Sequence, residues 1–169
     1  MITALHIAVI GEDRCAPRVA AQAERVGAAI ARAGAVLVCG GLGGVMEAAS
    51  RGAARAGGVV VGLLPGVDPA DANRWVTVPI ATGLGEGRNL LVVRAADALI
   101  AVGGMYGTLS EIALALKLGR PVIGLGTWTL HQPDGRRVPI VRVKTPADAV
   151  ARALAAARRS RRQARSPRA

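Results

Sequence analysis

Along the chain, short runs of consecutive apolar residues alternate with segments in which apolar residues recur every three or four positions. The apolar runs lie at residues 5–10, 36–39, 59–64, 98–102, 122–125 and 138–143, with a weaker run at 75–80. Continuous apolar runs are typical of strands that are buried on both faces of a sheet. The intervening periodicity predicts helices near residues 19–33, 44–56, 86–96 and 108–118. The alternation therefore predicts an α/β fold, a doubly wound, mostly parallel sheet with helices on both faces.

A last helix is predicted from the stretch Thr145-Pro146-Ala147-Asp148. Thr is a preferred N-cap, Pro fits the first helical position, and Asp three residues after the cap completes the pattern. The length of 169 residues favours one domain, which we expect over residues 1–157. The chain has no Phe, two Trp and one Tyr, so we expect a core of Val, Leu, Ile and Ala in closely approaching layers.

The net charge of +11 is concentrated at the end of the chain. Residues 158–169, RRSRRQARSPRA, contain six arginines and no acidic residue, and +11 minus these six leaves +5 for the rest. Such a composition cannot bury enough apolar surface to fold, so we expect residues 158–169 to be a disordered tail. Salt-sensitive binding of nucleic acid by these arginines is the alternative role.

Several classes of protein are excluded. No apolar run approaches the roughly 18 residues of a membrane-spanning helix, and the first eleven residues fit a strand rather than a signal peptide. We therefore expect a cytoplasmic protein that does not enter a membrane. Cys15, Cys39, His6 and His131 match no metal-ligand spacing, so we expect no metal site.

Two predicted strands end in the same pattern of glycines. AGAVLVCGGLGG at 33–44 aligns without a gap with ADALIAVGGMYG at 96–107, and in both a strand leads through GG-x-x-G into a helix. Neither loop is a dinucleotide fingerprint or a GK[ST] phosphate loop. Ligands bind outside the carboxyl ends of parallel strands, and a helix start offers free N–H groups to an anion. We expect these loops to bind a phosphate group, or a carboxylate as second choice, through Gly40, Gly41, Gly43, Gly44, Gly103, Gly104, Met105, Tyr106, Gly107 and Thr108.

Alternative interpretations exist for the polar residues around the second loop. Thr108 and Glu111 have the spacing of a capping box, in which both side chains satisfy the first N–H groups of their own helix. Arg88 could be a surface arginine paired with Glu86 or Asp97. Asn73 lies in the predicted loop 65–74, which either closes over a ligand or is only a connection.

The segment GGMYGTLSE at 103–111 resembles the PGGxGTxxE signature of the LONELY GUY family of cytokinin-activating phosphoribohydrolases. The longer stretches 36–53 and 83–128 are similar to a bacterial branch that resembles the molybdenum cofactor carrier proteins. The resemblance covers roughly residues 5–128 and implies a Rossmann-like fold, a homo-oligomer (dimer or tetramer) and a phosphorylated small-molecule ligand. Some relatives are labelled lysine decarboxylases, but neither Lys117 nor Lys144 lies in a recognisable cofactor pocket, so we reject that activity.

The resemblance implies one of two functions. As a carrier, the protein would need no cofactor for catalysis and would hold a molybdopterin-type cofactor as cargo. As a hydrolase, it would release the base from nucleoside 5′-monophosphates by cleaving the N-glycosidic bond. Glu111 would then orient water and stabilise the positive charge on the ribose, while Arg88 holds ligand and carboxylate in register.

Two positions depart from the signature. Gly103 replaces Pro, and Met105 replaces the second Gly of the pair. A side chain at residue 105 requires a negative φ or strains the loop, and it narrows the space beside the phosphate. This departure favours the carrier, whereas the retained Arg88 and Glu111 keep the hydrolase open.

Overall fold

A computed structural model describes residues 4–165. Its fold is built on one parallel sheet. Its strands lie in the order β4-β3-β2-β1-β5-β6-β7, and each neighbouring pair is parallel. The predicted doubly wound, Rossmann-like fold is confirmed, and the weaker strand begins later than predicted. The strands are β1 (His6–Ile10), β2 (Val36–Cys39), β3 (Val60–Leu64), β4 (Val78–Ala81), β5 (Ala98–Val102), β6 (Val122–Leu125) and β7 (Ile140–Val143).

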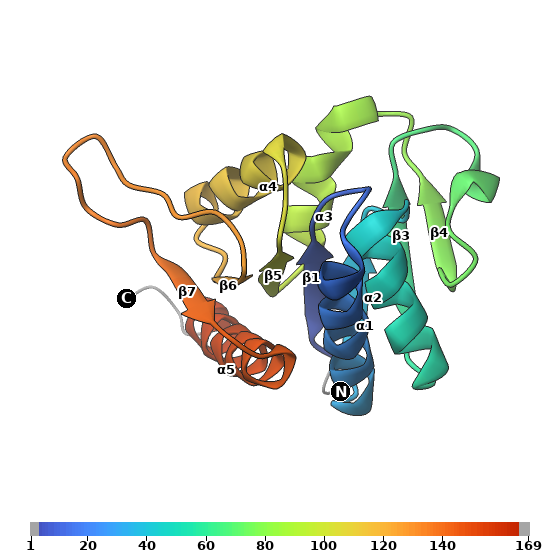
Figure 1. The fold of residues 1–169 in the computed structure, drawn as a ribbon, viewed down its shortest axis with the longest axis horizontal. Coiled ribbons are helices and arrows are strands. Elements are labelled where there is room, and N and C mark those ends of the chain that lie inside the picture. Colours follow the sequence, from blue (N-terminus) through green and yellow to red (C-terminus); the bar gives the residue numbers. More distant parts are fainter. Residues whose placement is uncertain (1–3, 166–169) are drawn as a thin grey trace.

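Helices cover both faces of the sheet (Figure 1). On one face lie α1 (Pro17–Arg32), α2 (Gly44–Arg55) and α5 (Pro146–Arg165), and on the other lie α3 (Asn89–Ala95) and α4 (Tyr106–Lys117). Two short 3-10 helices, η1 (Pro69–Asp71) and η2 (Gly85–Arg88), complete the set. The strand order reverses between β1 and β5, which creates the crevice where ligands bind in open parallel sheets.

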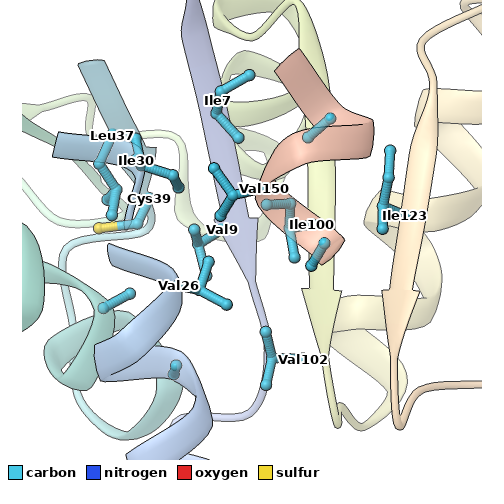
Figure 2. Close-up of a cluster of buried hydrophobic side chains, with 14 of the residues drawn as sticks. Ile7, Val9, Val26, Ile30, Leu37, Cys39, Ile100, Val102, Ile123 and Val150 are labelled. Atoms are coloured by element: carbon cyan, nitrogen blue, oxygen red, sulfur yellow. The ribbon is translucent and has the colours of Figure 1, made fainter. Parts of the chain in front are cut away.

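Alternating residues of the central strands supply two aliphatic cores. Ile7 and Val9 of β1 face α1, α2 and α5 and belong to the core shown in Figure 2, where strand residues pack against helix residues such as Val26. Ala8 and Ile10 face α3 and α4. Residues buried on both faces explain why the strands appear in the sequence as unbroken apolar runs.

The closely approaching layers expected from the composition are present between α1 and α2. A Cβ atom added to Gly27 would collide with the carbonyl of Ala49, and one added to Gly52 would collide with the carbonyl of Glu24. Small residues at the crossing therefore let the two helix backbones touch, and no aromatic side chain is needed to fill the space.

The expectation of a disordered tail is wrong for residues 158–165, because α5 continues to Arg165; residues 166–169 lie outside the described part. Arg161 holds this end of the helix, with Nη2 at 2.6 Å from Asp97 Oδ2 and at 2.8 Å from the carbonyl of Ala4. Arginine is also a good helix former, which composition-based reasoning about disorder ignores. The predicted start is confirmed, since the amide of Asp148 donates to Thr145 Oγ1 at 3.2 Å. Within residues 4–165, none of the helices is long and apolar enough to cross a membrane.

Candidate functional site

The second glycine loop joins β5 to α4 in a conformation that only glycine adopts easily. Gly103 has a φ of +59° and Gly104 a φ of +117°, and a Cβ on Gly104 would lie 2.5 Å from Thr108 Cγ2. Met105 has an extended backbone with a φ of −108° and a side chain that is 60% exposed. The departure from the family signature at residue 105 therefore causes no backbone strain.

The capping-box interpretation of Thr108 and Glu111 is wrong. Helix α4 begins at Tyr106, with Met105 as its N-cap and no side-chain cap, so both residues lie inside the helix. Both are buried, Thr108 being 3% and Glu111 7% exposed. Within the described chain, the amides of residues 106–108 donate no hydrogen bond, so the N-terminus of α4 can hold an anion.

Arg88, at the end of η2, is buried under the first glycine loop and is not a surface residue. Its Nη1 donates to the carbonyl of Gly40 at 2.6 Å and also to the carbonyl of Leu63. A Cβ on Gly40 would collide with the guanidinium, which explains the glycine at this position. The alternative pairing with Asp97 is wrong because Asp97 binds Arg161. Arg88 Nε is buried and has no hydrogen-bond partner in the described part of the chain.

Glu111 and Arg88 are both buried and influence each other through their charges, but among the described residues they form no ion pair. Burial raises the pKa of Glu111 from 4.5 to about 7, and the charge of Arg88 lowers it in part. Burial likewise lowers the pKa of Arg88, while Glu111 raises it. Among the described residues, no hydrogen bond or ion pair reaches the Glu111 carboxylate. Buried charged groups without partners are costly, and such pairs are typical of sites completed by a ligand.

Glu12 is a site residue that sequence reasoning missed. It follows β1, and its carboxylate accepts a hydrogen bond from the amide of Gly104 at 3.2 Å, while its carbonyl accepts one from Val45 at 3.0 Å. Glu12 thus links the start of α2 to the second glycine loop and occupies one amide that the sequence assigned to the ligand. Ligands bind outside the carboxyl ends of parallel strands, and applying this rule to β1 as well would have identified Glu12.

The first glycine loop follows β2 and is held by Asn73. The Asn73 side chain donates to the carbonyls of Gly41 at 3.1 Å and Leu42 at 2.9 Å. Gly41 and Gly44 both have positive φ values, +76° and +58°. Asn73 therefore fixes the loop rather than reaching into the site. Because β2 and β5 flank β1, the two glycine loops lie on either side of Glu12 and not next to each other.

The rim of the site carries exposed aromatic and apolar side chains. Tyr106 is 76% exposed, and its ring centroid lies 6.1 Å from that of Trp128 in a tilted arrangement. Cys39, at the end of β2, is fully buried, and burial raises the pKa of its thiol. Across residues 4–165, no group of three or more His, Cys, Asp or Glu side chains is arranged to hold a metal ion.

The model of the SLOG cluster4 family matches residues 4–150. An uncharacterised protein of Archaeoglobus fulgidus is 45% identical over 146 residues, which are 86% of this chain and 92% of that protein. The molybdenum cofactor binding protein of Rippkaea orientalis is 32% identical and has a similar structure (TM-score 0.83, covering 92% of this chain and 98% of that one). The molybdenum cofactor carrier protein of Chlamydomonas reinhardtii is 34% identical (TM-score 0.80, covering 91% and 98%).

Proposed function

Because the chain belongs to the SLOG cluster4 family, and its fold is that of proteins named as molybdenum cofactor carriers, we propose that it binds and carries a phosphorylated, nucleotide-like small molecule. The molybdenum cofactor, a phosphorylated pterin, is the first ligand to test. The observation that carries this proposal is the buried Arg88–Glu111 pair, which has unused hydrogen-bonding capacity beside free amides at the start of α4.

The residues present suit such a ligand. The amides of residues 106–108 and the positive end of α4 would bind the phosphate. Arg88, through its unpartnered Nε, and Glu111 would hydrogen-bond polar edges of the ring system, because a guanidinium and a carboxyl group complement such edges. The exposed ring of Tyr106 and the thioether of Met105 would cover the apolar part of the ligand.

The carrier proposal is tested by mixing the purified protein with molybdenum cofactor released from a molybdoenzyme and measuring the pterin that coelutes on gel filtration. The wild type should retain the cofactor, and Arg88→Gln should lose most of it. Glu86→Gln, an exposed change in the same 3-10 helix, is the matched control and should retain it. Equal retention by Arg88→Gln and wild type would contradict a binding site at Arg88. No retention by the wild type would contradict the molybdenum cofactor as the ligand.

A nucleoside 5′-monophosphate phosphoribohydrolase is the second candidate, favoured by the pKa of about 7 for the buried Glu111. A carboxylate at the anomeric carbon would stabilise the positive charge that develops as the N-glycosidic bond breaks. The wild type and Glu111→Gln are incubated with AMP, and free adenine is measured. Adenine release that is lost in Glu111→Gln would establish the hydrolase and overturn a purely carrying role.

We further propose that the chain forms a homo-oligomer. Val67, Leu84 and Tyr106 follow the carboxyl ends of β3, β4 and β5, and these large apolar or aromatic residues have exposed fractions of 84%, 56% and 76%. Exposed apolar side chains that gather on one part of a surface are typical of interaction sites. Light scattering after gel filtration should give a mass of at least twice 17.2 kDa; a mass of one chain would contradict this proposal.

A further inference from the structure

A groove opens at the carboxyl edge of the sheet, on the side of α1. This groove has a volume of about 650 Å³ and is lined by residues of α1, by Gly103 and by the ends of β6 and β7. None of its lining residues belongs to η2 or α4, the elements that contain Arg88 and Glu111. Its volume falls within the range of small-molecule sites, about 300–1,000 Å³.

The charged residues in the groove lining are all positive. Arg18 of α1, Arg142 of β7 and Lys144 contribute cations, and the lining contains no acidic residue. Among the described ion pairs, none involves these three side chains. Arg142 binds only neutral acceptors, with Nη1 at 3.1 Å from the carbonyl of Trp128 and at 2.5 Å from Thr129 Oγ1. Its positive charge is therefore fixed beside the groove but not neutralised.

Two of the cations lie at helix N-termini, where positive charge is unfavourable. Arg18 is the second residue of α1, whose first turn contains no acidic residue and whose N-cap, Ala16, provides no side-chain cap. Lys144 directly precedes Thr145, the N-cap of α5. Within the described chain, the amide of Arg18 donates no hydrogen bond, as is usual in a first helical turn, so it is available to an anion.

The acidic residues at this edge offset only part of the positive charge. The Glu12 carboxylate lies against Gly103 and accepts a hydrogen bond from the amide of Gly104, so it supplies one negative charge against three cations, and Asp148 pairs with Arg152 at 2.9 Å. The groove also contains Gln22, one helical turn after Arg18, as an uncharged donor, and Val19 and Leu125 as apolar walls. Cations, a free amide and apolar walls together suit a ligand with a multiply charged anionic group and an organic part.

We propose that this groove is a second anion-binding site, which takes the phosphate or diphosphate group of a phosphorylated small molecule. Arg18 and Lys144 bind the anion directly, and Arg142 supplies a fixed positive charge. The site does not depend on a ligand at Arg88 and Glu111, because the two sites share no charged residue.

The first experiment measures pyrophosphate binding by calorimetry at constant ionic strength. The double variant Arg18→Gln/Lys144→Gln is compared with Arg25→Gln/Lys117→Gln, which removes the same charges from exposed positions of α1 and α4 outside the groove. We expect saturable binding to the wild type, a loss of affinity of at least about tenfold in the first double variant, and little change in the second. Equal weakening in both variants, unchanged binding in the first, or no saturable binding to the wild type would overturn the proposal.

The second experiment needs no variant for its main readout, because Lys117 and Lys144 are the only two lysines in the chain. Both are exposed, so an amine-reactive ester labels both, and mass spectrometry measures each rate. Pyrophosphate should slow the labelling of Lys144 and leave Lys117 unchanged, in wild type and in Arg88→Gln alike. Protection of both lysines, or of neither, would refute a localised site. Loss of Lys144 protection in Arg88→Gln would show that the anion binds at the Arg88 site instead.

Discussion

The buried carboxyl group of Glu111 should make the stability of the protein depend on pH. Its pKa is raised from 4.5 to about 7, so the unfolded chain gives up this proton at lower pH than the folded one. Below pH 4.5 both states hold the proton, so this group does not lower the free energy of unfolding. The loss of stability grows between pH 4.5 and about pH 7 and is complete above about pH 7. The shift amounts to about 3 kcal/mol of lost stability at pH 8, but only about 1 kcal/mol at pH 5.

Glu111→Gln removes this titration while it preserves the size and polarity of the side chain. We expect its free energy of unfolding to exceed that of the wild type by about 3 kcal/mol at pH 8 and by about 1 kcal/mol at pH 5. Urea unfolding at pH 5, 6, 7 and 8 measures both values, with Glu86→Gln as an exposed control that should follow the wild type. A difference between Glu111→Gln and wild type that stays constant from pH 5 to pH 8 would refute the raised pKa.

Three further predictions concern the loops and α5. Gly104→Ala should lower the free energy of unfolding by about 2 kcal/mol or more, because φ is +117° and the added Cβ meets Thr108. The control is Gly107→Ala, which has open space around its Cβ and should be neutral or stabilising in the same urea experiment. Arg161→Ala should lower the free energy of unfolding by about 1–2 kcal/mol, because a partly buried ion pair with Asp97 is lost. The same change should speed amide hydrogen exchange in residues 158–165, and unchanged exchange would contradict this anchoring role. Glu12→Gln should strengthen pyrophosphate binding about tenfold, because it removes the negative charge that lies against Gly103 in the groove lining. Unchanged or weaker binding would contradict this reasoning.

The sheet could be predicted from the sequence because its strands are buried on both faces. Strands β2, β5 and β6 have the predicted bounds, and each of them ends directly before a glycine, Gly40, Gly103 or Gly126. At the edge this signal weakens: β4 exposes Val78 and Ile80 to 42% and 43%, and its start was predicted three residues too early. The glycine loops could be recognised because most of their glycines are required. Gly41, Gly44, Gly103 and Gly104 have positive φ values, and a Cβ on Gly40 would collide with Arg88.

The polar residues of the site could be identified from the sequence, but their environments could not. Thr108 and Glu111 have the spacing of a cap, yet α4 starts two residues earlier because Gly104 turns the chain and Met105 takes the N-cap position. The burial of Arg88 depends on carbonyls of β3 and of the loop after β2, which are distant in sequence. The order of α5 beyond residue 157 depends on distant partners, among them the Asp97 carboxylate and the carbonyl of Ala4, which both bind Arg161. Composition and local spacing contain no information about such partners.

Both proposed sites depend on the reversal of strand order between β1 and β5. At this point α1 leaves β1 toward one face of the sheet and α4 leaves β5 toward the other, so the ends of the two strands open onto both faces. The chain places Arg88 and the free amides of α4 on one side, and Arg18 and Lys144 on the other. Between them, Glu12 is bound to one backbone amide. One carboxylate cannot balance positive groups on both faces, and water screens the open groove more strongly than the buried pair. Anions that bind on the two sides should therefore differ in salt dependence, with weaker dependence at the buried Arg88 side.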